Sequence, residues 1–247
     1  MIENNATRSA LDSEFPLRPI EVISVLAAAG LVLVHLVRFA LTPELHWWLT
    51  LVAIAAGMLA ADFVSGVIHW AGDTWGGEGT PWIGPRFIRP FRFHHAQPLD
   101  MLGSHFFTTN GDTALASLPF LLAPFAVPLG TQAGQAASVF LWTVGAWGMW
   151  THQFHKWAHM KSPPRGVRWL QRLGLILGPA HHRRHHRSPF AINYCITTGW
   201  CNPVLTQIRF FPALEHVVSW LTGWRPRGEP KPTMPTAARA ARTAGIP

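Results

Sequence analysis

Two long apolar stretches near the N-terminus constrain the fold more strongly than any other feature of the chain. They cover residues 20–41 and 47–70, and as helices each can cross a hydrocarbon core of about 30 Å. Two weaker apolar stretches follow at residues 113–130, where three prolines occur, and at residues 136–159. Together the four stretches predict an all-α fold, a four-span helical membrane bundle.

The composition supports a membrane protein of one domain. Hydrophobic residues make up 49% of the chain and charged residues only 13%, about half the usual share in a soluble protein. We expect residues 1–19 to form a cytoplasmic N-terminal segment and residues 20–224 the membrane domain. Residues 225–247, which are rich in Pro, Ala and Arg, are expected to form a disordered tail.

The distribution of basic residues predicts how the bundle lies in the membrane. Four spans place both termini on one side, and all of the 20 Lys and Arg except Arg38 then fall on that side. The positive-inside rule makes it the cytoplasmic side. No plastid transit signal is visible and the usage of Ala, Arg and Pro is like that of a GC-rich bacterium, so we expect a bacterial inner-membrane protein. A net charge of +8 also suits nucleic-acid binding, but the apolar stretches favour a membrane protein with no nucleic-acid partner.

The 14 histidines are the second unusual feature. Many of them fall at the cytoplasmic ends of the predicted spans or in the segments that follow, so a four-span topology gathers them on one face as a His-rich, di-metal cap. These histidines are His69, His94, His95, His105, His155, His159, His181, His182, His185 and His186.

The spacing of these histidines adds a chemical argument. His155 and His159, the residues of the two pairs within 181–186, and His69 with Asp73 lie four residues apart, and such residues share one face of a helix. Neutral imidazoles at this spacing can hold a metal ion between them. The set exceeds the four ligands of a structural zinc site and therefore predicts two ions with open positions. Imidazole alone does not distinguish Zn, Cu, Fe and Ni.

Several residues have simpler interpretations. His35, His46 and His216 are interpreted as ordinary polar residues, and so is His152, which is out of phase with the predicted ligands of its segment. The run HHRRHH could form a basic face for anionic lipid, but the other histidines on the same side disfavour this alternative. The chain has 2 cysteines, too few for a disulfide framework or a thiolate zinc cluster.

Five motifs, in order, resemble the plasmanylethanolamine desaturase family. They are ADFVSGVIHWAGDTWG, IRPFRFHHAQPLDMLGSHFFTTNGD, HKWAH, HHRRHHRSP and YCITTGWCNP, and the resemblance covers roughly Ala60 to Arg227. It implies a membrane enzyme with two iron ions that uses O2 and two electrons to introduce a double bond into a phospholipid-linked chain. The implied product is the vinyl ether of plasmalogens, made from plasmanylethanolamine. Phe93 departs from the pattern, because animal members usually have Glu there.

The resemblance also implies the iron ligands, and the positions of other residues suggest further roles. The iron ligands of the family carry over to all the histidines of the predicted cap. Three neighbouring residues are expected to orient these histidines: Asp73, Asn110 and Asp112. Asp73 could also bind metal directly. Four basic residues lie where the lipid phosphate is expected: Arg86, Arg89, Arg92 and Lys156.

The electrons must come from outside the chain. It contains no flavin fingerprint, no haem-attachment motif and no iron–sulfur cysteine set. We therefore expect a b-type cytochrome, or a ferredoxin with its reductase, as the electron donor.

Two alternatives remain open at this point. An acyl-lipid (fatty-acid) desaturase or a hydroxylase would use the same ligand set, so motif spacing does not separate them. A non-enzymatic metal transporter or sensor would place ionisable residues near mid-span, whereas here the predicted ligands gather at one face, and His35 and Asp62 lie further inside the predicted spans.

Overall fold

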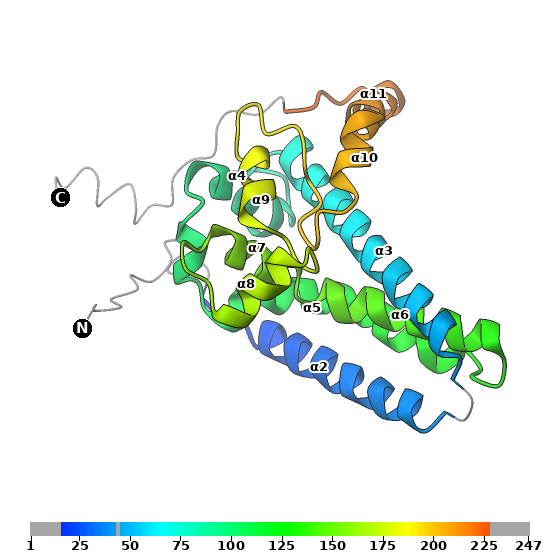
Figure 1. Cartoon of the computed structure of the whole chain (residues 1–247). Coiled ribbons are helices and arrows are strands. Elements are labelled where there is room, and N and C mark those ends of the chain that lie inside the picture. Colours follow the sequence, from blue (N-terminus) through cyan, green and yellow to red (C-terminus); the bar gives the residue numbers. More distant parts are fainter. Residues whose placement is uncertain (1–15, 43–44, 228–247) are drawn as a thin grey trace, which may run out of the picture.

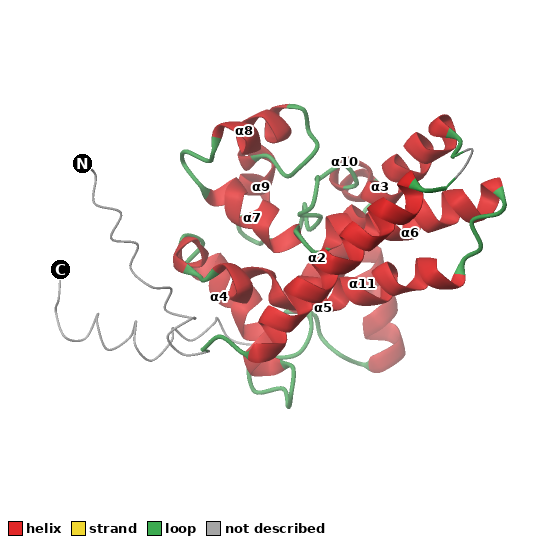
Figure 2. Cartoon of the chain, turned by 90° about the horizontal axis from the view of Figure 1, so that it is seen from below, coloured by secondary structure: helices red, strands yellow, loops and turns green. Residues whose placement is uncertain are grey.

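The computed structural model describes residues 16–42 and 45–227, and within these ranges every regular element is a helix (Figure 1, Figure 2). The long helices are α2 (Pro19–Ala40), α3 (Trp47–Thr74), α5 (Phe106–Leu122) and α6 (Gln132–Gly148). The shorter ones are η1 (Gly84–Ile88), α4 (Arg89–Ala96), η2 (Asp100–Gly103), η3 (Ala123–Ala126), α7 (Thr151–His159), α8 (Arg165–Arg172), α9 (Pro179–His185), α10 (Asn202–Gln207) and α11 (Phe210–Thr222). The expected all-α fold is confirmed for the described part of the chain.

Helices α2 and α3 correspond to the two long apolar stretches. Both are long and apolar enough to cross a membrane. Pro19 lies in the first turn of α2, where its missing N–H would have no helical partner. Their outer faces carry apolar side chains, since Leu33 is 63% exposed and Val52 is 58% exposed. Such faces suit lipid rather than water.

The other two apolar stretches form helices whose bounds differ from the predicted ranges. α5 begins at Phe106, where the side chain of His105 accepts a hydrogen bond from a backbone N–H of the first turn. The stretch 136–159 is divided between α6 and α7, because the backbone leaves helical geometry at Trp150. α5 and α6 have 17 residues each, slightly fewer than the roughly 20 that a spanning helix needs.

Helix α6 lies between α3 and α5, while α2 packs against α5. Two glycines permit this close approach. A Cβ atom at Gly57 would lie 2.6 Å from Thr143 Cβ, and one at Gly145 would lie 2.6 Å from Leu121 Cγ. Small residues of this kind let helix backbones approach where lipid, not water, surrounds them.

The shorter helices α4, α7 and α9 gather at one end of the bundle, near the C-terminal end of α3 (Figure 1). A proline in the first turn begins both α4 and α9, which is a favourable position for proline. α4 packs against α3, and α9 packs against α7. Segments that lie far apart in the sequence therefore meet at this end, which we call the cap.

The predicted terminal segments lie mostly outside the described residues, which exclude 1–15 and 228–247. Arg227, at the start of the predicted tail, is held against the cap. Its backbone N–H donates to Thr74 O at 2.8 Å, and its guanidinium donates to Tyr194 Oη at 2.8 Å and pairs with Glu215 at 2.7 Å. The folded part of the chain thus includes Arg227.

The Gly57 contact yields a test of the α3–α6 packing. Gly57→Ala should lower the free energy of unfolding by about 1–3 kcal/mol, because the new methyl group overlaps Thr143 in a packed interface. Gly30→Ala in α2 is the matched control, because a Cβ there meets nothing within 4 Å, and removing a helical glycine should stabilise by roughly 0.5–1 kcal/mol. Denaturant unfolding in detergent micelles measures both; equal effects would contradict the packing described.

Candidate metal centre

Five histidines, four on α4, α7 and α9 and one directly after α9, form the first group of the cap, called the five-histidine group: His94, His155, His159, His182 and His186. One nitrogen from each ring lies within 4.8 Å of the others. His159 Nε2 lies 2.9 Å from His94 Nε2 and 2.8 Å from His182 Nε2. His186 Nε2 lies 3.1 Å from His94 Nε2 and 2.9 Å from His182 Nε2. The rings therefore point at a common centre.

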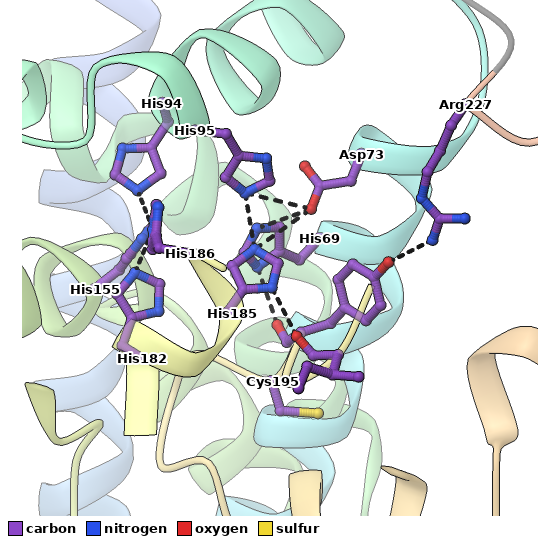
Figure 3. Close-up of polar contacts among 12 residues, drawn as sticks. His69, Asp73, His94, His95, His155, His182, His185, His186, Cys195 and Arg227 are labelled. Atoms are coloured by element: carbon purple, nitrogen blue, oxygen red, sulfur yellow. Dashed lines mark hydrogen bonds and ion pairs between the residues drawn. The ribbon is translucent and has the colours of Figure 1, made fainter. Parts of the chain in front are cut away.

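Three histidines and one carboxylate form the second group, called the three-histidine group: His69, Asp73, His95 and His185. The C-terminal end of α3 supplies His69 and Asp73, which lie one turn apart. Asp73 Oδ2 lies 3.3 Å from His69 Nε2, 3.7 Å from His95 Nε2 and 3.5 Å from His185 Nε2. Figure 3 shows the three-histidine group, with Asp73, beside four members of the five-histidine group: His94, His155, His182 and His186.

The adjacent histidine pairs divide between the two groups. His94 joins the five-histidine group and His95 the three-histidine group, while His186 and His185 divide in the same way. Successive residues on a helix point in directions about 100° apart, so one short helix can supply ligands to two neighbouring centres. The groups are close, since the ring centroids of His95 and His186 lie 5.2 Å apart.

Backbone carbonyls set the tautomer of two rings in the three-histidine group. The Nδ1–H of His69 donates to Tyr194 O at 3.0 Å, and the Nδ1–H of His185 donates to Ile192 O at 2.8 Å. A carbonyl can only accept, so Nδ1 must carry the proton and Nε2 must present a lone pair. Such contacts commonly orient metal-binding histidines.

Burial keeps the rings of the cap neutral. It lowers the pKa of His186 from 6.5 to about 4. Burial, followed by repulsion from neighbouring imidazoles, lowers the pKa of His95 to about 2 and of His159 to about 3. Neutral imidazole is the form that binds metal.

The donor atoms fit metal ions better than they fit one another. His159 Nε2 lies within 3.3 Å of the Nε2 atoms of His94, His155 and His182, yet one ring nitrogen has a single lone pair or a single proton to share. The buried carboxylate of Asp73 accepts no hydrogen bond from any described residue. Two cations, one in each group, would satisfy both sets of donors.

Two of the predicted ligands lie outside both groups. His105 is an exposed residue at the start of α5, where its Nδ1 accepts from the N–H of Phe107 at 3.4 Å. His181 Nε2 accepts from the side-chain amide of Asn202 at 3.0 Å. Its i,i+4 partner, His185, belongs to the three-histidine group, so this one spacing does not bring two rings to one centre.

The residues expected to orient the histidines occupy different places. Asp73 lies within the three-histidine group. Asn110 donates to the side chain of Gln153 in α7 at 3.1 Å, next to the histidines of that helix. Asp112 pairs with Arg18 at 3.0 Å and its side chain is 58% exposed, so it lies away from both groups.

The basic residues expected near lipid phosphate all have contacts within the protein. Arg92 is buried and donates to Gly76 O at 2.6 Å, and Lys156 donates to Ser104 O at 2.7 Å. Arg86 and Arg89 form longer ion pairs, at 3.8 Å from Glu21 and from Glu78 respectively.

A supporting role for Asp62 in α3 was missed by sequence reasoning. Its Oδ1 accepts from the N–H groups of Thr198 and Gly199 at 2.8 Å, and its Oδ2 accepts from the N–H of Cys201 at 2.9 Å. These bonds hold the loop that carries the Tyr194 carbonyl. The signal was present, because an acidic residue inside an apolar helix needs a specific reason to be there.

Fold and site together define a helical protein with two candidate membrane spans and two adjacent histidine-rich groups suited to metal ions. Residues 58–229 match the family model described as the lipid desaturase domain. The chain is 43% identical over 211 residues to the plasmanylethanolamine desaturase of Myxococcus xanthus, covering 85% of this chain and 75% of that protein. It is 40% identical over 204 residues to plasmanylethanolamine desaturase 1 of Mus musculus, covering 80% and 74%.

A plant relative is also similar. The chain is 37% identical over 181 residues to the chloroplastic fatty acid desaturase 4 of Arabidopsis thaliana, covering 72% of this chain and 54% of that protein. No solved structure matches the chain. The chain belongs to the lipid desaturase family, and it is therefore an oxidoreductase. The resemblance noted in the five motifs is confirmed, and the transporter and sensor alternatives are set aside.

Metal content tests the division into two groups. His182→Ala and His185→Ala should each lower the bound metal from about two ions to about one per chain, because each removes a ring from a different group. His181→Ala and His105→Ala should keep about two, as should the surface control His216→Ala. Elemental analysis of the purified proteins measures this; loss of metal in His181→Ala would contradict the grouping.

Acid should destabilise the metal-free protein. Unfolded histidines titrate near 6.5, whereas the folded-state pKa values of His95, His159 and His186 are about 2, 3 and 4. Below about pH 6.5 the unfolded state therefore binds more protons, and stability falls as the pH falls. The unfolding temperature should be lower at pH 5.5 than at pH 7.5, and nearly constant between pH 7.5 and 8.5. An unchanged value at pH 5.5 would contradict the buried, neutral cap.

Proposed function

We propose that this protein is an O2-dependent di-iron lipid desaturase of a membrane, which introduces a double bond into a phospholipid-linked chain. The convergence of the two histidine groups at one end of an apolar bundle is the observation that supports this most directly. Rings from α3, α4, α7 and α9 share the cap, and the motifs that supply them are those by which the chain resembles its family.

Each group would hold one iron ion. The five-histidine group offers nitrogen ligands only, while the three-histidine group adds the Asp73 carboxylate. His105 and His181, which the resemblance also implies as ligands, are not assigned to either ion. Iron bound in the cap would supply, with O2, the oxidising power to break an unactivated C–H bond, which side chains lack.

The chain's own residues would prepare the site for this chemistry. The carbonyls of Tyr194 and Ile192 keep two Nε2 atoms free to bind metal. Asp62 anchors the loop that carries one of these carbonyls. The buried rings of His69, His155, His182 and His185 would help to exclude water, which protects an oxidising centre from side reactions.

The substrate we favour is plasmanylethanolamine, because the relatives that are 43% and 40% identical to this chain are named plasmanylethanolamine desaturases. Two hydrogens would leave adjacent carbons of the ether-linked chain, and with O2, two electrons and two protons the products are a vinyl ether and two water molecules. Desaturation of a fatty acyl chain is the alternative, which the similarity to the Arabidopsis enzyme supports; a hydroxylase on this scaffold is less favoured.

The membrane arrangement is part of the same proposal. α2 and α3 would span the bilayer together with the shorter α5 and α6, and the cap would face the cytoplasm of a bacterial cell. A stretch without Asp or Glu, residues 113–214, contains six arginines between 165 and 187, which supports a cytoplasmic location. This basic surface would also attract an acidic electron donor, either a b-type cytochrome or a ferredoxin with its reductase. Arg86 and Arg89 remain the candidates for a lipid phosphate contact.

Lipid analysis tests the function. Expression in a host that makes alkyl ether phospholipids should produce acid-labile vinyl ethers, detected by mass spectrometry. His182→Ala should abolish the product because the five-histidine group loses a ring, while His216→Ala should not. A new acyl double bond in place of a vinyl ether would support the alternative, and no new double bond or hydroxyl would contradict both.

A further inference from the structure

A cavity of about 110 Å³ lies beside the cap, between α3, α5 and α6. α3 contributes four residues to its wall: Ala61, Val64, Ser65 and Ile68. Their spacing of three, four and seven residues places them on one face of the helix. The wall therefore runs along the helix axis for about two turns, or roughly 10 Å.

α5 forms the opposite wall with the same spacing. Its four residues are Thr113, Ala116, Ser117 and Phe120, and Val144 and Gly148 of α6 lie between the walls. α3 runs toward the cap and α5 runs away from it, so Ile68 and Thr113 mark the end of the cavity near the cap. Ala61 and Phe120 mark the far end. We call this cavity the α3–α5 groove.

The groove presents an apolar lining even where hydroxyl groups occur. Thr113 Oγ1 donates to Met149 O at 2.9 Å, Ser117 Oγ donates to Thr113 O at 2.8 Å, and Ser65 Oγ donates to Asp62 O at 2.7 Å. These hydroxyl protons are already used in hydrogen bonds to backbone carbonyls of the protein. A polar ligand would lose its bonds to water here without replacement, whereas a hydrocarbon would not.

The groove ends one side chain away from the metal centre. The ring of Phe91 lines its cap end and contacts the ring of His69, with centroids 5.2 Å apart. His152 lines the same end, and its Nδ1–H donates to Thr109 O at 3.2 Å. A molecule that lies in the groove therefore ends next to the three-histidine group.

The groove is also open at the side. Ile68 is 40% exposed, and Ala116 on the facing helix is exposed as well. Both belong to helices whose outer faces are apolar. In a bilayer this opening would face the lipid chains rather than the aqueous phase.

We propose that the α3–α5 groove receives a segment of one unbranched hydrocarbon chain of a membrane phospholipid, which enters sideways from the bilayer. The carbons to be oxidised lie at the Phe91 end, and Ala116 and Phe120 limit the width and the length of the chain that fits. This inference rests on the proposed function for its chemistry, but binding of the chain can be measured without turnover.

The test uses the full-length, metal-loaded protein in nanodiscs that contain a phosphatidylethanolamine with a diazirine in its sn-1 chain. After illumination, mass spectrometry of peptides should locate the label mainly at residues 61–68 and 113–120. Ala116→Phe should reduce this labelling about tenfold by filling the groove. Ala56→Phe is the matched control, since Ala56 is an exposed residue of α3 outside the groove, and its labelling should equal that of the wild type.

Metal content confirms that each variant is folded, and Ala116→Leu replaces Ala116→Phe if the latter loses its metal. Labelling that is spread equally over the outer face of α2, or that is unchanged in the variants that fill the groove, would overturn the proposal that the groove binds the chain. Labelling in the groove without any desaturated product from the wild type would support the groove and contradict the proposed function. Product with no labelling in the groove would contradict only the proposal that the groove binds the chain.

Phe120→Ala should shift the products toward longer chains, and an unchanged distribution of chain lengths would refute the role of Phe120.

Discussion

The close packing of neutral imidazoles in the cap is the constraint on which the rest of the structure depends. Closely packed ring nitrogens such as those of His159 and His182, 2.8 Å apart, are largely withdrawn from water and face one another's lone pairs, which costs free energy unless a cation lies between them. The same packing of imidazoles should destabilise the fold when metal is absent. It also makes the cap a strong set of metal ligands. Metal binding and folding of the cap are therefore expected to be coupled.

Rigid support for the cap comes from outside it. The Asp62 carboxylate, buried in an apolar helix, is satisfied by backbone N–H groups of the loop after Tyr194. On the other side, Arg227 links Tyr194 to Glu215 and to the end of α3. Both sets of contacts bear on one loop carbonyl and thus on the orientation of His69. The glycine contacts between α3 and α6 position the helix that carries Asp62 and His69.

Much of the site followed from patterns in the chain. The i,i+4 spacings of His155 with His159, of His182 with His186, and of His69 with Asp73 correspond to pairs that share a group in the structure. His181 and His185 have the same spacing but do not share a group, because the side chain of His181 bonds to Asn202. Spacing fixes which face of a helix two residues share, but the rotation of that helix against its neighbours decides what the face meets. The division of 136–159 into two helices was not foreseen for a similar reason: apolar periodicity continues through the break at Trp150.

The sequence by itself determined that the chain is helical, that two helices are long and apolar enough to cross a membrane, and that its histidines belong to a desaturase family. The first two properties depend on composition and local pattern, and the third on the motifs by which the chain resembles that family. Only the tertiary structure decided that His94 and His95 serve different groups, that a carbonyl 125 residues away orients His69, and that a groove between α3 and α5 reaches the cap. Those features arise between segments distant in the chain, where side-chain packing and backbone hydrogen bonds, rather than local pattern, set the geometry.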